Sequence, residues 1–214
     1  MKKRDYITPM PIPEAVDLGL PSGLKWASFN LGASKPEEYG YYYGWGCTEP
    51  YADDEDANKT TYVEKIGGTG TAYSDCGTDK DPLKDYVKPN NKSIAGTKWD
   101  AARQKLGGAW HMPTTTELAE LLEPNNCNWQ WTKENGVDGY KVTSKKNGNS
   151  IFLPAAGCRG GTSLAYAGSY GYFWSSSPIL DNGVNAYGMA FDSSCFGWYY
   201  GYRCLGFAVR PVSE

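Results

Sequence analysis

Apolar residues recur at helical spacing between residues 111 and 124. Leu118, Leu121 and Leu122 fall on one face of a helix, and a threonine precedes the first turn as a candidate N-cap. Pro124 ends the pattern because proline cannot continue a helix. This segment is therefore predicted to be the best-defined helix of the chain.

Two shorter segments also show helix signals. Residues 100–108 begin with aspartate, place an apolar side chain at Leu106, and have a glycine at position 107, where helices commonly end. Residues 34–39 begin with Ser34, have a proline near the first turn and place two glutamates at the positive end of a helix dipole. We expect a short helix in each segment.

Short apolar runs separated by turn residues predict antiparallel strands elsewhere. A Pro-Ser-Gly turn divides residues 16–33 into a β-hairpin. Residues 127–136 and 139–154 predict further hairpin structure with Lys-Asn-Gly-Asn as a turn, and Trp129 and Trp131 should face the same way. Closing strands are expected at residues 173–177, 186–191 and 206–212.

The stretch from Gly168 to Val212 differs in composition from the rest of the chain. It is dense in Tyr, Trp, Phe, Ser and Gly, which binding surfaces use because rigid rings supply contact area and small polar residues supply adaptable hydrogen bonds. From Gly160 through Ser213 there is no Lys, Glu or Gln, whereas residues 1–146 contain sixteen Lys, ten Glu and two Gln. The stretch resembles an antibody paratope in its residue types.

Two explanations account for the gap in Lys, Glu and Gln. Closely spaced strands disfavour Lys and Glu and favour aromatic residues. Alternatively, none of the three can arise by changing the first two bases of the Asn codons AAC and AAT. Within residues 178–205 only Met189 and Trp198 lie outside the set that can arise in this way, so both are expected to be scaffold positions if the segment is varied. The second explanation is adenine-targeted mutagenesis of the coding sequence.

We therefore predict a variable ligand-binding face within residues 178–205, with Trp198 included among its contacts. The predicted contact residues are Ile179, Leu180, Asp181, Asn182, Val184, Asn185, Tyr187, Asp192, Cys195, Phe196, Trp198, Tyr199, Tyr200, Tyr202, Cys204 and Leu205. Cys195 and Cys204 are expected to be products of diversification that are not bonded to each other.

Charge and hydropathy exclude several classes of partner. A formal net charge of -3 and a pI near 5.3 provide no basic field for nucleic acid. There is no run of eighteen apolar residues and no apolar signal-peptide core near the N-terminus, so direct membrane insertion is not expected. The Pro-rich residues 1–15 are interpreted as a linker that serves attachment or oligomerisation.

Candidate metal and catalytic residues are few. The six cysteines have no C-x-x-C spacing, and His111 is the single histidine, so no metal site, cofactor or catalytic residue is predicted. Residues 51–92 are polar and rich in Gly and Asp, which predicts a long loop. Its acidic run at 53–56 lacks the ligand spacing of an EF-hand and is interpreted as a solvated loop rather than a calcium site.

Three motifs in this order resemble a known family. They are Leu-Gly-Gly-Ala-Trp-His-Met-Pro-Thr at residues 106–114 with the leucine-rich helix after it, Phe-Trp-Ser-Ser-Ser at 173–177, and Gly-Phe-Ala-Val-Arg-Pro-Val at 206–212. Together they resemble C-type lectin-like domains of the formylglycine-generating-enzyme type, and in particular the variable proteins of diversity-generating retroelements and related bacterial surface proteins. The resemblance extends over residues 16–212.

The resemblance implies an α+β fold in a single domain at residues 16–212: two helices flanking small antiparallel sheets, long loops, and termini that lie together. In such a scaffold the side chains of Trp174, Phe191, Phe207 and Val209 are expected to be buried.

The favoured function is a non-enzymatic ligand-binding protein for receptor recognition or adhesion. It would display its diversified segment to a protein or glycan on a cell or host surface, from a location on the cell surface, on a virion or in secreted form. Two alternatives remain open. One is an oxidase of the formylglycine-generating type that uses Cys195 and Cys204, and the other is a sugar-binding lectin that uses residues 123–125, which we interpret as a helix stop.

Overall fold

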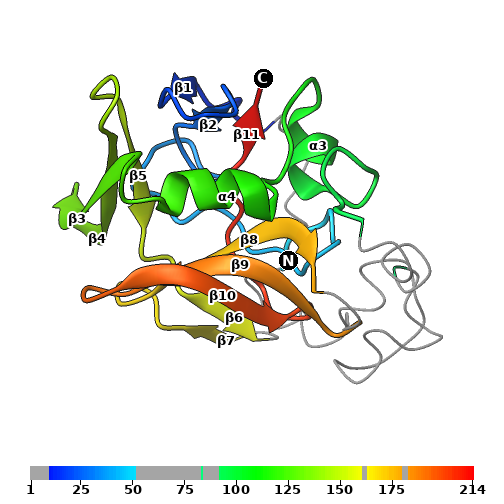
Figure 1. The fold of residues 1–214 in the computed structure, drawn as a ribbon. Coiled ribbons are helices and arrows are strands. Elements are labelled where there is room, and N and C mark those ends of the chain that lie inside the picture. The colour runs from blue at the N-terminus through cyan, green and yellow to red at the C-terminus, as the bar shows by residue number, and fades with distance from the viewer. Residues whose placement is uncertain (1–9, 52–82, 84–91, 161–162, 180–182) are drawn as a thin grey trace.

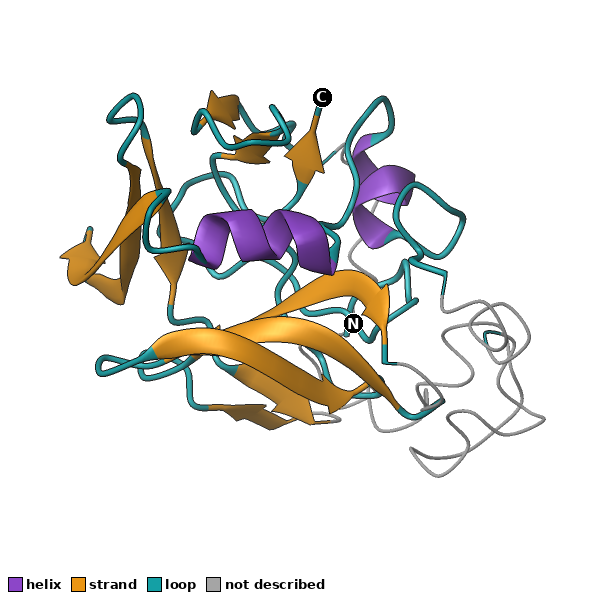
Figure 2. Cartoon of the chain, in the orientation of Figure 1, coloured by secondary structure: helices purple, strands orange, loops and turns teal. Residues whose placement is uncertain are grey.

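The computed structural model describes residues 10–51, 83, 92–160, 163–179 and 183–214. Among these residues about 9% are helical and about 39% lie in strands, which form several small antiparallel sheets (Figures 1 and 2). The expected α+β class with flanking helices is therefore wrong, and the protein has a β-rich fold. The physical reason is that the helices, of six and eight residues, are too short to form a layer.

Both helices lie where the sequence predicts them. α3 spans Ala101–Leu106, and Asp100 caps it by accepting a hydrogen bond from the backbone N–H of Arg103. α4 spans Thr115–Leu122, and a reciprocal capping box closes its N-terminus. Both predictions are confirmed. They could be made from the sequence because a capping residue and the turn it closes lie within a few residues of each other.

The helix expected at residues 34–39 is wrong, because the segment forms only turns. The Glu38 carboxylate accepts hydrogen bonds from the backbone N–H (2.7 Å) and the hydroxyl (3.0 Å) of Ser34, so the capping groups close a single turn. Gly40 has a φ of 73°, and a Cβ there would lie 2.6 Å from the carbonyl oxygen of Leu31. This close return of the chain ends the turn before a helix can propagate.

The first sheet joins the two ends of the described chain. β1 (Ala15–Asp17) and β2 (Lys25–Ala27) form the predicted hairpin, which is confirmed. β11 (Val212–Ser213) pairs antiparallel with β2 and places Val212 opposite Trp26. The sheet order is β1-β2-β11, so the C-terminal strand lies beside the N-terminal hairpin.

A second sheet has the order β3-β4-β5, formed by β3 (Cys127–Glu134), β4 (Val137–Ser144) and β5 (Ser150–Pro154). The expected hairpin structure is confirmed, with one tight turn beyond the predicted Lys-Asn-Gly-Asn turn. The additional turn is at Asn135 and Gly136, which have φ angles of 47° and 86°. Positive φ at both central residues is the geometry that Asn-Gly favours in two-residue hairpins.

The third sheet has the order β10-β9-β8 and supports the candidate site. Its strands are β8 (Gly171–Pro178), β9 (Asn185–Phe191) and β10 (Phe196–Tyr202). β6 (Cys158–Gly160) and β7 (Ser163–Ala165) form a small hairpin. In Figure 1, α4 lies on one side of the third sheet and the β6–β7 hairpin on the other, with β10 at its outer edge.

Two hydrophobic clusters lie on opposite sides of this sheet. The first contains Leu118 and Leu121 of α4 with Phe173, Met189 and Phe191 of the sheet. The second contains Trp174 and Ala186 from the opposite side of the same strands, with Phe207 and Val209 from the segment that follows β10. The four residues expected to be buried are confirmed, and none is more than 2% exposed: Trp174, Phe191, Phe207 and Val209.

The aromatic segment at residues 41–46 packs beneath the C-terminal strands. The backbone N–H of Tyr43 donates to the carbonyl of Phe207 at 2.9 Å. The indole N–H of Trp45 donates to the carbonyl of Ser175 at 2.8 Å, and that of Trp174 to the carbonyl of Tyr43 at 2.7 Å. Residues 206–208 meet their neighbours through isolated bridges rather than as the strand that was expected.

The buried side chain of Arg210 donates hydrogen bonds to groups in separate segments of the chain. It donates to the Asn30 side chain (2.9 Å) and to the carbonyl oxygens of Ala27 (2.9 Å) and Phe152 (2.6 Å). Burial lowers the pKa of Arg210 to about 9, which still leaves it charged at neutral pH. The buried cation therefore depends on these acceptors, which belong to segments far apart in the sequence.

Candidate ligand-binding face

β10 presents alternate side chains to opposite sides of the sheet. Residues directly opposite in an antiparallel pair share a face, and β10 pairs with β9 so that Trp198 lies opposite Met189 and Tyr200 opposite Tyr187. Trp198, Tyr200 and Tyr202 therefore point to the α4 side. Because β10 lies at the sheet edge, these side chains are 51%, 64% and 45% exposed. We call these three residues the aromatic face.

The turn between β9 and β10 is organised by Asp192. Its carboxylate accepts hydrogen bonds from the N–H of Ser194 (2.7 Å), the hydroxyl of Ser194 (2.6 Å) and the N–H of Cys195 (3.0 Å). These bonds, those from Ser194 above all, lower the pKa of Asp192. The Asp-Ser-Ser-Cys sequence thus makes a tight return that positions β10 against β9.

Two rings of β10 are held by the neighbouring structure. Phe196 stacks on Trp129, with ring centroids 4.4 Å apart and an interplanar angle of 8°. Trp129 and Trp131 both contact Tyr140, so the expectation that they face the same way is confirmed. On the other side of the sheet, Tyr199 packs on Tyr172 and Phe207, with centroid separations of 5.2 and 6.0 Å. The strand that bears the aromatic face is therefore supported on both sides.

A group of tyrosines forms a separate aromatic surface on the opposite side of the third sheet. Tyr166, Tyr170 and Tyr172 contact one another, and Tyr172 contacts Tyr199. We call these four residues the tyrosine cluster. Burial raises the pKa of Tyr172 to about 12 and that of Tyr199 in the same direction, so both hydroxyls stay protonated. The sequence signal for this cluster was the repeated Tyr at positions 166, 170 and 172.

The structure brings together only some of the predicted contact residues. Phe196, Trp198, Tyr199, Tyr200 and Tyr202 lie on β10, Tyr187 lies beside them on β9, and Asp192 and Cys195 lie in the turn. Ile179 and Asn185 are half-buried at strand ends, and Leu180, Asp181 and Asn182 lie outside the described residues.

Three predicted contacts lie beside the interior instead. Val184, Cys204 and Leu205 are half-buried and pack against the second hydrophobic cluster. Met189, expected as a scaffold position, is 1% exposed. The codon interpretation also predicted Trp198 to be a scaffold position, yet its side chain is 51% exposed on the aromatic face.

Cys195 is a free, exposed thiol, so the expectation that it is not bonded to Cys204 is confirmed. The two cysteines also lie beyond opposite ends of β10. The seven residues between them in that strand extend over about 23 Å at the usual rise per residue. A cooperating cysteine pair is therefore disfavoured. Cys76 and the acidic run at 53–56 lie outside the described residues.

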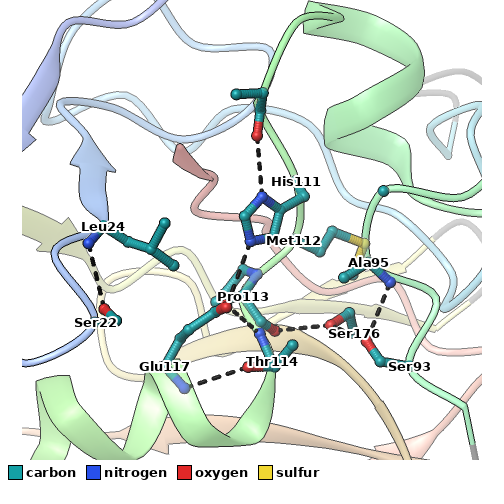
Figure 3. Close-up of polar contacts among 12 residues, drawn as sticks. Ser22, Leu24, Ser93, Ala95, His111, Met112, Pro113, Thr114, Glu117 and Ser176 are labelled. Carbon is teal, nitrogen blue, oxygen red and sulfur yellow. Dashed lines mark hydrogen bonds and ion pairs between the residues drawn. The ribbon is translucent and has the colours of Figure 1, made fainter. Parts of the chain in front are cut away.

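His111 has structural contacts (Figure 3). Its ring nitrogens lie 3.0 Å from the Ala109 carbonyl oxygen and 3.5 Å from the Glu117 carboxylate. Burial works against the charged imidazole, but the Glu117 carboxylate and the Ala109 carbonyl outweigh it and raise the pKa of His111. Because His111 also bridges Val212 through the backbone, this pair links the start of α4 to the C-terminal strand.

Residues 123–125, the candidate sugar-binding motif, directly follow the last turn of α4. Glu123 is the C-cap of α4 and its carboxylate accepts the N–H of Asn125 at 3.1 Å, as expected of a helix stop. Within the part of the chain that the structure describes, no group of three or more His, Cys, Asp or Glu side chains could hold a metal ion. Over the same residues, no helix has the length and apolar character needed to cross a membrane.

Residues 129–212 match a domain of unknown function, DUF8237. The match runs from β3 to β11 and so includes the whole third sheet and the aromatic face. No curated protein and no solved structure matches the chain. The resemblance to C-type lectin-like proteins stays a prediction.

Proposed function

We propose that this chain is a ligand-recognition protein that binds a protein or glycan on a cell or host surface through the aromatic face of β10. One observation is the main support: Trp198, Tyr200 and Tyr202 project from a strand that the interior holds in place. Large rings exposed to this degree are costly to solvate and are enriched at binding sites. Ligand binding gives them a physical role.

The support beneath the face limits the entropy lost on binding. A Cβ at Gly188 would lie 2.4 Å from the carbonyl oxygen of Phe173, and one at Gly201 would lie 2.7 Å from the ring of Phe207. These close approaches leave little room for the strand to shift. A rigid backbone with few mobile side-chain torsions loses less freedom when a ligand docks.

We further propose that the coding region of residues 178–205 is diversified by a retroelement. The support is the residue set of this segment, together with the separation between projecting and buried side chains along it. Changing Tyr200 or Tyr202 alters the exposed surface, whereas Met189 and Ala186 lie in the hydrophobic clusters. Variation confined to projecting positions leaves the packing that determines stability intact.

Binding is tested by screening the purified chain against immobilised glycans and cell-surface protein ectodomains. For the ligand found, Trp198→Ala and Tyr200→Ala should each weaken binding by at least about tenfold, the effect of losing a central aromatic contact. Tyr166→Ala is the matched control, since Tyr166 is a comparably exposed ring (60%) on the other side of the sheet. Equal losses in all three variants would contradict the assignment of the aromatic face.

Diversification is tested by sequencing the DNA around the coding region in many isolates. We expect a reverse-transcriptase gene and an imperfect copy of the region that encodes residues 168–212, differing from it only at adenines of the copy. Substitutions spread over all four bases, or a region identical in every isolate, would refute this part of the proposal without affecting ligand binding.

The same geometry supports a non-enzymatic role. An oxidase of the formylglycine-generating type would need Cys195 and Cys204 to converge, and they lie beyond opposite ends of β10. Incubation with copper, oxygen and a cysteine-containing sulfatase peptide should therefore give no turnover. Measurable formylglycine would overturn this.

A further inference from the structure

The outer edge of β10 presents unpaired backbone groups. Hydrogen bonds from Asp192 N to Cys195 O and from Arg203 N to Val184 O, both 2.9 Å, mark the hydrogen-bonded pairs at the two ends of the β9–β10 ladder. Such pairs alternate with pairs whose N–H and C=O groups point away from the partner strand. The outward positions within β10 are therefore residues 196, 198, 200 and 202. The carbonyl of Tyr202 accepts the N–H of Leu205, whereas no residue in the described part of the chain bonds to the outward backbone groups of residues 196, 198 and 200.

This edge lacks the usual protection against strand pairing. Natural edge strands carry charged side chains, prolines or bulges that prevent another strand from adding. β10 is Phe-Gly-Trp-Tyr-Tyr-Gly-Tyr, with no charge and no proline, and it pairs with β9 in unbroken register over all seven residues. A long, uncharged and regular edge favours strand addition.

We infer that β10 pairs antiparallel with β10 of a second copy of this chain, about a two-fold axis at Trp198. In this register positions 196, 198 and 200 of the two copies meet one another: Trp198 lies opposite its own counterpart, and Phe196 lies opposite Tyr200. Each directly opposed pair exchanges two hydrogen bonds, so the three pairs form about six. The uncharged strand meets itself without electrostatic repulsion.

The side chains also complement each other in this register. On the side of the tyrosine cluster, Tyr199 of one copy lies opposite Gly197 of the other, where a ring has room because a Cβ at Gly197 would meet nothing within 4 Å. On the α4 side, ring lies beside ring, a favourable cross-strand pairing. A register centred on Tyr199 would need the carbonyl of Tyr202 as an acceptor between the two copies. That carbonyl already accepts the N–H of Leu205 at 2.8 Å, so the register centred on Trp198 is favoured.

The result is a continuous six-stranded sheet in which the aromatic faces of the two copies lie side by side and stay open. This inference goes beyond the proposed function and does not depend on it, because pairing uses the backbone edge and needs no ligand. A contact along one strand edge buries less surface than the standard interface of about 1,600 Å². The dimer should therefore be weak and should dissociate on dilution.

The experiment measures the mass of the full chain by sedimentation equilibrium over a concentration series. Wild type should change from monomer to dimer as concentration rises. Trp198→Lys and Trp198→Glu each place like charges opposite one another at the two-fold axis, and each should stay monomeric over that range. An equimolar mixture of the two variants should form a heterodimer, because the opposed charges then attract.

Ser193→Lys is the matched control, since it adds the same charge at the exposed turn and not on the edge, and it should dimerise like wild type. Restoration by mixing also shows that the charged variants are folded. A wild-type chain that stays monomeric at every concentration overturns the inference. So do Trp198→Lys and Trp198→Glu chains that dimerise separately, or a mixture that does not dimerise.

Discussion

Removal of the Phe207 ring tests whether the interior supports the aromatic face. Phe207 is 1% exposed, and its ring stacks on Trp174 with centroids 4.1 Å apart. Phe207→Ala should therefore reduce the free energy of unfolding by about 3–5 kcal/mol, the usual cost of truncating a buried phenylalanine. Tyr200→Ala, at a ring that is 64% exposed, should change it by no more than about 0.5 kcal/mol.

The assay is equilibrium urea unfolding followed by tryptophan fluorescence, with the midpoint and slope compared among variants. A loss below about 1 kcal/mol for Phe207→Ala would mean that its cavity collapses and that the ring is not a support. A loss above about 1 kcal/mol for Tyr200→Ala would mean that this ring belongs to the packed interior and not to the face.

A double-mutant cycle locates the contact between Phe207 and β10. A Cβ at Gly201 would lie 2.7 Å from the Phe207 ring, so Gly201→Ala should destabilise wild type by about 1–3 kcal/mol through overpacking. In the Phe207→Ala background the ring is gone, and Gly201→Ala should cost much less. Gly197→Ala is the control, since nothing lies within 4 Å of its Cβ position. Additive effects of the Gly201 and Phe207 substitutions would refute the contact.

Three further outcomes are expected. Arg210→Ala should cost at least about 3 kcal/mol, because it leaves three buried acceptors without their donor, and thermal unfolding would show the loss. The raised pKa of His111 and the lowered pKa of Glu117 mean that their pair stabilises the fold most between the ordinary values of 4.5 and 6.5. This contribution is lost as pH rises through the pKa of His111 or falls through that of Glu117, so the difference in melting temperature between wild type and His111→Gln should peak in that window. Cys195→Ser should leave stability within about 0.5 kcal/mol in reducing and oxidising buffer alike, and a redox-dependent shift would contradict the free thiol.

The local elements of the fold were readable from the sequence. α3 and α4 occur where their capping residues predicted, because a cap and the first turn it closes lie within four residues. The same reasoning failed at residues 34–39, where Ser34 and Glu38 interact as a cap would but the chain returns to Leu31. That return is a tertiary contact, and no local pattern encodes it.

The strand β10 illustrates the larger limit. Its aromatic and glycine residues show no alternation of polar and apolar positions, because both of its sides carry rings, so periodicity could not identify it as a strand. The sequence nevertheless identified this region as the candidate site, because residue composition reports the chemistry of a surface without reference to its geometry. Local capping was thus sufficient for the two helices, and composition for the segment that contains the candidate site, whereas the buried rings were expected from the family resemblance.

Only the tertiary structure decided the β-rich class and which members of that segment are exposed. Val184 and Leu205 belong to the segment predicted to be the ligand-binding face, yet they pack against the second hydrophobic cluster. Tyr200 and Tyr202 are exposed because β10 is the edge strand of its sheet. Tyr166 and Tyr170, from a segment some thirty residues earlier, join Tyr199 in the tyrosine cluster on the other side of that sheet. Exposure depends on strand order and on contacts between distant segments, and these are properties of the whole fold that no single stretch of sequence contains.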